Sequence, residues 1–190
     1  MLLGVLVAWF GLVRTPIPTA VEEGKATIPL WRMTAMGAAS LPVLALSSPL
    51  ADLELVATRR LRSMQRRYLA GLSGVCAVTY LALCAIVLHP SVVVIIARSW
   101  VAWFGLALVA GAALGWRLAW ALPSAVAVVL WYWGYSGHER YQWWEFSARP
   151  HDDLPSLVLS IALLAAGLTA YAATPWRRRF WAFVMPRRRR

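Results

Sequence analysis

Long hydrophobic runs separated by short polar segments form the main pattern along this chain. The two clearest runs, at residues 68–89 and 154–174, have the length that a helix needs to cross the roughly 30 Å hydrocarbon core of a bilayer. Two further runs, at 91–115 and 118–133, meet at a short turn around Arg117, which predicts a hairpin of two more spans. The pattern therefore predicts a protein built from membrane-spanning helices.

The N-terminal part of the chain is less regular. A run at 2–13 would form a helix of only about 18 Å. We predict it as a retained first span, because Arg14 follows the run, whereas a signal peptide carries its basic residues before it. The polar, proline-containing stretch at 14–27 is predicted as a loop. A second span is predicted at 28–50.

Three polar or helix-breaking features lie inside these runs. In the second span, Trp31 and Arg32 match an interfacial anchor pair, and Pro42 predicts a kink. Because an arginine inside the bilayer is costly, Arg98 favours a surface or re-entrant piece at 91–97 and a span that begins near Ser99. Small residues in the same run predict close helix contact, within the chain or with a second copy: Gly105, Ala107, Gly111, Ala112 and Gly115.

The composition supports an all-α bundle of about six transmembrane helices that forms a single transmembrane domain over residues 1–190. Hydrophobic residues make up 61% of the 190 positions, above the roughly 45–50% of a soluble domain. Six spans leave no room for a separate soluble domain. The net charge of +11 does not predict a nucleic-acid partner, because the basic residues border apolar runs, where they report membrane orientation.

With six spans, most basic residues fall in segments on the same side of the membrane. They lie in the loop before residue 68, at Arg117 and in the tail at 175–190. Lysine and arginine accumulate in cytoplasmic loops, so this side is predicted to be cytoplasmic, with both termini inside. All but one of the 19 basic residues are arginine, which is typical of a GC-rich bacterial genome. We therefore expect a multi-pass protein of a bacterial plasma membrane, in contact with the lipid bilayer.

The segment at 48–67 is amphipathic and lies between the second and third spans. Its pattern fits a surface helix that rests on a membrane or enters the groove of a partner. The apolar face holds Leu50, Leu53, Ala57, Leu61 and Met64, and the opposite face holds Asp52, Arg59, Arg62 and Arg66.

The loop at 134–153, predicted to be extracytoplasmic, contains fragments of catalytic motifs. His138 and Glu139 begin like the zinc-binding HExxH motif, but the second histidine is absent. Residues 134–137 spell the GxSG of intramembrane serine proteases, and no histidine lies in the following span. We therefore assign no catalytic, cofactor-binding or metal-binding residue.

Two other groups in this loop have ordinary explanations. His151, Asp152 and Asp153 precede an apolar run, as residues that open and cap a helix do. The aromatic residues of the loop fit interfacial anchoring, and the alternative is a rim around a substrate site on the outer face: Trp143, Trp144 and Phe146.

The whole chain resembles the small permease subunits of bacterial type 2 ABC exporters, which have six spans and a cytoplasmic coupling helix between spans two and three. It departs from them in its short first span and in lacking an N-terminal amphipathic connecting helix. The resemblance is carried by the Arg117 hairpin, by the tryptophan-bearing outer loop and by the coupling segment with its Ser48, Pro49, Leu50, Leu53, Glu54, Ala57, Arg59, Arg60 and Arg62.

The resemblance implies that a separate ABC ATPase subunit binds ATP and Mg and hydrolyses the nucleotide. This chain lacks the GxxxxGK[ST] phosphate loop, needs no cofactor of its own and would not be an enzyme. A second permease subunit, the same or a homologous chain, would complete the path. The implied ATPase-docking residues are Leu50, Leu53, Glu54, Ala57, Arg59, Leu61 and Arg62.

The alternative is a membrane-embedded enzyme or an accessory assembly protein with its site in the loop at 134–153. Its chemistry would rest on the titratable residues of that loop: His138, Glu139, Glu145, His151, Asp152 and Asp153. A neighbouring gene that encodes an ATPase, or co-purification of such a subunit, would separate the two readings.

Overall fold

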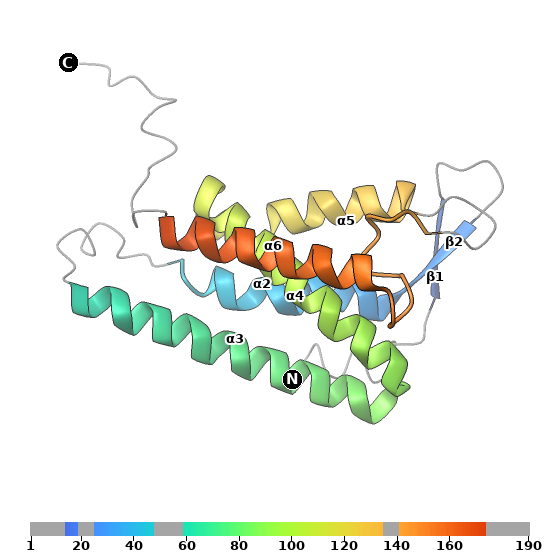
Figure 1. Ribbon diagram of the computed structural model, residues 1–190, viewed down its shortest axis with the longest axis horizontal. Coiled ribbons are helices and arrows are strands. Elements are labelled where there is room, and N and C mark those ends of the chain that lie inside the picture. Colours follow the sequence, from blue (N-terminus) through green and yellow to red (C-terminus); the bar gives the residue numbers. More distant parts are fainter. Residues whose placement is uncertain (1–13, 19–24, 48–58, 135–140, 174–190) are drawn as a thin grey trace, which may run out of the picture.

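The computed structural model describes residues 14–18, 25–47, 59–134 and 141–173. In these ranges the chain is helical apart from one short hairpin and the connecting segments (Figure 1). The helices are α2 (Leu30–Leu44), α3 (Arg59–Val87), α4 (Pro90–Leu114), α5 (Ala121–Trp133) and α6 (Leu154–Ala173), with a short 3-10 turn, η2 (Trp116–Leu118).

Three of these helices are long and apolar enough to cross a membrane: Ser63–Val87, Pro90–Leu114 and Leu154–Ala173. They show an all-α, multi-pass membrane architecture by helix length and composition, and two of these helices cover most of the predicted spans at 68–89 and 154–174. With 13 residues, α5 reaches only about 20 Å, well short of the hydrocarbon core. The structure therefore shows three candidate spans among the described residues, where the sequence predicts six in the whole chain.

The stretch predicted as a loop at 14–27 instead forms part of an antiparallel hairpin, β1 (Arg14–Pro18) with β2 (Lys25–Pro29). Pro16 pairs with Thr27, Pro18 with Lys25, and Pro29 with Arg14. These are alternate cross-strand pairs, and in an antiparallel ladder alternate pairs exchange no hydrogen bonds. Prolines placed in those pairs remove no ladder bond, which is how a proline-containing stretch can still form a ribbon.

At the centre of the bundle lies α4, which packs against α6 and α2 and also contacts α3 and α5. In its membrane-length window 61% of the residues are buried, compared with 11% in α3 and 17% in α6. The other two spans therefore present most of their surface to the surroundings. The apolar character of those outward faces is what a bilayer would cover.

Small residues bring α4 and α6 together. A Cβ atom added at Gly105 would collide with the backbone of Leu163, and one added at Gly167 would collide with the backbone of Gly105. The predicted small-residue face of α4 thus makes a helix contact within the chain. The same helix ends at Gly115, whose φ of 98° is a conformation that other residues rarely adopt.

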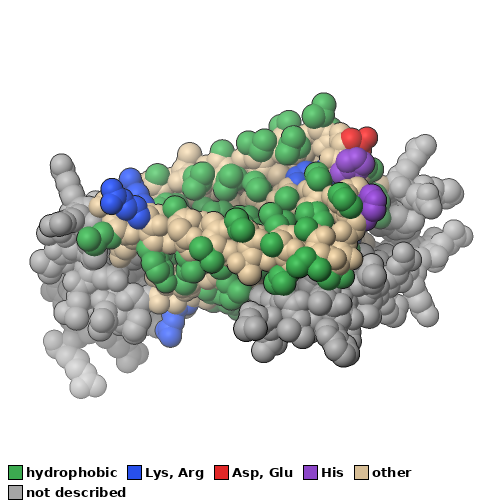
Figure 2. Space-filling view, turned by 90° about the horizontal axis from the view of Figure 1, so that it is seen from below, with side chains coloured by type: hydrophobic (Ala, Val, Ile, Leu, Met, Phe, Trp, Pro, Cys, Tyr) green, Lys and Arg blue, Asp and Glu red, His purple; other side chains and the backbone are tan. Residues whose placement is uncertain are grey.

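The ends of the helices gather into two groups (Figure 1). We call one group the loop end; it holds the two paired strands, the α3–α4 connection and residues 141–153, which precede α6. At the other, the basic end, α2, α4 and α6 finish and α3 begins. On the face seen in Figure 2, Lys and Arg side chains gather mainly at the basic end, and acidic and histidine side chains lie at the opposite end. On this face the described basic and acidic side chains therefore lie at opposite ends of the bundle.

No break separates the predicted coupling segment from the third span, because α3 runs as one helix from Arg59 to Val87. Residues 59–67 are its first turns, whereas residues 48–58 lie outside the described part. The first span at 2–13 and the tail at 175–190 also lie outside it. Those assignments stay predictions.

Candidate functional site

The segment at 141–153, which we call the loop segment, carries the most unusual polar contacts of the described chain. Three consecutive residues in it, Glu145, Phe146 and Ser147, are buried. Trp143, two residues before Glu145, is exposed, so a short irregular stretch turns from the surface into the end of the bundle. Irregular backbone at this depth needs partners for its polar groups, and two arginines supply many of them.

The first arginine, Arg32, belongs to the opening turn of α2 and forms a buried cluster with Glu145 and Ser147, the Arg32 cluster. Its Nη2 donates to Glu145 Oε1 at 2.7 Å, and its Nε donates to Ser147 Oγ at 3.2 Å. Ser147 in turn donates to Glu145 Oε1 through its backbone N–H at 3.1 Å and its hydroxyl at 2.6 Å. Positive and negative charges are thus paired and hydrogen-bonded inside the protein.

This cluster corrects the prediction that Arg32 is an interfacial anchor. The arginine is only 8% exposed and pairs with Glu145, which is 113 residues away in the sequence. A buried ion pair stabilises the folded state little more than an apolar pair would, since both charges lose their hydration. Removing one partner is expensive, because the remaining charge is left buried and unpaired.

The Glu145 carboxylate also touches the end of α5. Gly134 caps this helix, and a Cβ atom there would collide with Glu145 Oε2. The carbonyl of Gly134 accepts a hydrogen bond from the backbone N–H of Gln142 at 2.9 Å. Glycine at this position therefore lets the loop segment lie against α5.

The second arginine, Arg98, corrects the prediction of a re-entrant piece at 91–97 and a span that begins near Ser99. The helix α4 is continuous from Pro90, and Arg98 is buried at 5% exposure within it. Its Nη1 donates to the carbonyl of Pro150 at 2.8 Å, and its Nη2 donates to the carbonyls of Phe146 at 3.1 Å and Arg149 at 2.7 Å. Three carbonyls take the place of water at Nη1 and Nη2, Nε is buried without a partner, and the helix continues through this position.

Asp153 ends the loop segment as the cap of α6. Its Oδ2 accepts from the backbone N–H of Ser156 at 2.9 Å and also from the Ser156 hydroxyl, which confirms the capping prediction. Arg149 pairs with the same oxygen at 3.3 Å. Burial alone would raise the pKa of Asp153, but the two Ser156 hydrogen bonds, with Arg149 and Arg98, hold the pKa below its ordinary value. Its neighbours His151 and Asp152 are exposed.

Of the aromatic residues predicted to form a rim, two lie at the surface and one lies in the core. Trp143 is 68% exposed and Trp144 is half-buried, so both reach the surface. Phe146 is 2% exposed and meets the Trp103 ring edge-on at a centroid distance of 4.9 Å. It therefore anchors the loop segment in the core and is not available to line an outer rim.

A second buried polar contact joins α2 to α3. The hydroxyls of Thr34 and Tyr80 lie 2.9 Å apart, and the Tyr80 hydroxyl donates to the Trp31 carbonyl at 3.1 Å. These contacts involve the first turns of α2, next to Arg32. Neither the Arg32 cluster nor this bridge was identified from the sequence, where the only signal was the presence of polar side chains inside apolar runs.

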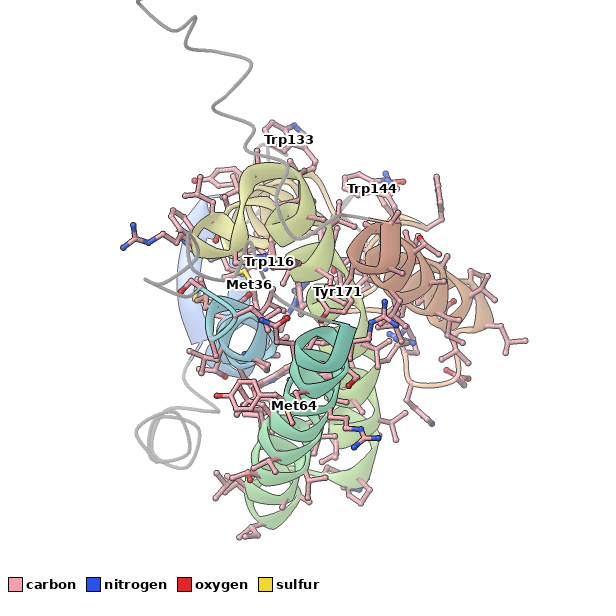
Figure 3. The ribbon with its side chains drawn as sticks, turned by 90° about the vertical axis from the view of Figure 1, so that its left-hand side faces the viewer. Met36, Met64, Trp116, Trp133, Trp144 and Tyr171 are labelled. Atoms are coloured by element: carbon pink, nitrogen blue, oxygen red, sulfur yellow. The ribbon has the colours of Figure 1, made fainter. Side chains whose placement is uncertain are left out.

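At the basic end the contacts are mainly aromatic and apolar. The Trp116 ring meets the Tyr171 ring at 5.7 Å, and the Trp116 ring also fills the space beside Gly111. Figure 3, viewed along the bundle from this end, shows Trp116, Met36 and Tyr171 between the helices, whereas Trp133 points away from them. The aromatic contact joins η2 to α6.

The predicted ATPase-docking residues fall in two groups. Leu50, Leu53, Glu54 and Ala57 lie outside the described residues. Arg59, Leu61 and Arg62 belong to the first turn of α3, which places their backbone at the basic end. In the described ranges no group of three His, Cys, Asp or Glu residues could hold a metal ion, and His138 and Glu139 lie outside those ranges.

Comparisons with family models, with curated proteins and with solved structures gave no match for this chain. The geometry described above is therefore the basis for the functional proposal.

Proposed function

We propose that this chain is the permease subunit of an ATP-driven exporter and that its basic end receives a separate ABC ATPase. The observation that supports this most is the length and continuity of α3. Its 29 residues span about 43 Å, more than the hydrocarbon core requires. The helix therefore extends beyond the membrane at the basic end, where Arg66 and Arg67 are exposed.

A continuous helix of this kind suits the transmission of force. A transporter must convert the nucleotide-driven closure of soluble subunits into movement of its spans. In α3 the first turns, predicted to belong to the docking segment, and the membrane span are one rigid element, so displacement at Arg59 moves the span with it. ATP and Mg belong to the ATPase, and a second permease subunit, identical or homologous, would form the path with this chain.

Two acidic residues that the enzyme alternative would use are already engaged in structural contacts. Glu145 pairs with Arg32, and Asp153 caps α6. Both carboxylates are hydrogen-bonded within the protein and are not free to act on a substrate. This supports transport over catalysis in the loop segment.

The proposal is tested by co-purification of an ABC ATPase subunit with this chain. Leu53→Asp combined with Leu61→Asp places two charges on the apolar face of the docking segment. Truncation of a buried anchor at an interface typically costs about 2 kcal/mol or more, so the pair should release the ATPase. The matched control is Glu54→Ala, which leaves both anchors in place and should retain most binding.

Membrane insertion of both variants is checked by their extraction with detergent and by their elution as single species. Binding of the ATPase by the double variant as tightly as by the original chain would exclude this segment as the docking element. Failure of the original chain to capture any ATPase would exclude the proposed function.

A further inference from the structure

Four helices meet the loop segment at the loop end, and each is fixed to it by a different contact. Arg32 joins α2 to Glu145, and Arg98 joins α4 to three loop carbonyls. Gly134 brings α5 against the Glu145 carboxylate, and Asp153 caps α6. The loop segment is thus attached to four helices at this end of the bundle.

The two arginine attachments differ in kind. Arg98 donates only to backbone carbonyls, and no carboxylate in the described ranges pairs with it at salt-bridge distance. Its release would leave several loop carbonyls without partners while the arginine stayed inside a continuous helix. Arg32 instead donates to two loop side chains, so a shift of the first turn of α2 breaks side-chain contacts and leaves no loop carbonyl without its partner.

The position of Arg32 connects the two ends of the molecule. It lies in the first turn of α2 at the loop end, and the same 15-residue helix finishes at Leu44 on the basic end, shortly before the predicted docking segment. Between the ends α2 packs against α4 and α3, and it stays one helix from Leu30 to Leu44 with Pro42 inside it. A shift of α2 along or about its axis would act first on the contact at its opening turn.

We propose that the Arg32 cluster is a releasable latch. Its opening frees α2 from the loop segment and opens the loop end, while Arg98 keeps the loop segment attached to α4. The latch itself is a property of this chain alone. Its use, to release a substrate on the outer side when nucleotide acts at the basic end, rests on the proposed function.

Hydrogen exchange of the chain in lipid nanodiscs tests the latch, because the Ser147 amide donates directly to Glu145. In the original chain this amide should exchange by local opening, faster than the amides beside Gly105 on the α4–α6 crossing. Glu145→Gln keeps the shape and removes the charge. It should accelerate exchange at Ser147 and in the second turn of α2 by about tenfold or more, with the crossing unchanged.

Two further variants keep the test decisive. Ser147→Ala removes one hydroxyl and should give a smaller acceleration in the second turn of α2. Arg32→Glu combined with Glu145→Arg reverses the pair and should restore protection in the second turn of α2, but not at the Ser147 amide, which loses its carboxylate acceptor. The latch is overturned if Glu145→Gln leaves exchange at Ser147 unchanged, or if it accelerates all helices equally, as a purely structural contact would.

The role in transport is tested separately in the assembled complex. Addition of a non-hydrolysable ATP analogue should accelerate exchange at Ser147 and in the first two turns of α2 together. If the ATPase binds but the nucleotide leaves these amides unchanged, the role in transport is wrong while the permease assignment stands. If no ATPase binds, the permease assignment fails and the nanodisc result still decides the latch.

Discussion

The loop end and the basic end of the bundle use arginine in opposite ways. At the loop end, Arg32 and Arg98 are buried and hold an irregular segment to the helices. At the basic end, Arg66, Arg67 and Arg117 are exposed, and the helices are joined by apolar and aromatic contacts instead. Substitution of an arginine should therefore affect stability at one end and membrane or partner contacts at the other.

The largest difference is expected from the Arg32 cluster. Glu145→Ala leaves Arg32 buried without its carboxylate, which typically costs about 3–5 kcal/mol. The matched substitution at the basic end, Arg66→Ala, should change the free energy of unfolding by less than about 0.5 kcal/mol. Unfolding in mixed detergent micelles measures both, and equal losses would remove the distinction between the two ends.

A smaller but still large loss is expected at the α4–α6 crossing, which lies between the ends. Gly167→Ala adds a Cβ atom where the backbone of Gly105 already lies, and overpacking of this kind costs about 1–3 kcal/mol. Gly74→Ala on α3 is the control, because nothing lies within 4 Å of its added Cβ atom. Equal stability of the two variants would argue against close packing of these helices.

The aromatic contact at the basic end should contribute less. A double-mutant cycle with Trp116→Ala and Tyr171→Ala should give a coupling of about 0.5–1.5 kcal/mol, the usual range for an edge-on aromatic pair. The cycle uses the same unfolding measurement. Additive single substitutions would show that η2 and α6 are held together by other contacts.

The smallest effect is a pH dependence that belongs to the loop end. The folded state holds the pKa of Asp153 below its ordinary value of 3.8. Its contribution to stability is therefore fully present above the unfolded pKa and is lost as the pH falls through the folded pKa. Asp153→Asn keeps a capping side chain and should flatten this part of the unfolding profile below about pH 4. An unchanged profile would mean that other carboxylates produce the acid sensitivity.

The sequence predicts the long spans well because their signal is local. An apolar run such as 154–174 specifies its own helix, and the capping role of Asp153 follows from the residues beside it. On the face seen in Figure 2 the described basic side chains also lie mainly at one end of the bundle. These features need no knowledge of which helix lies next to which.

The candidate site could not be predicted in this way, because its contacts join distant parts of the chain. Arg32 looks like an interfacial residue when only its neighbours are considered, and its partner is 113 positions away. Arg98 looks too costly to bury until three loop carbonyls are known to reach it. The prolines of the hairpin suggest a loop unless the pairing register is known.

The central claim is that the two ends lie on opposite sides of a membrane, and cysteine accessibility tests it most directly. The native Cys76 and Cys84 are first replaced by serine, and single cysteines are then introduced as Ser63→Cys near the basic end and Trp143→Cys on the loop segment. With an impermeant maleimide, Trp143→Cys should be labelled from outside intact cells, and Ser63→Cys only after the membrane is opened. Labelling of both positions from the same side would contradict the account.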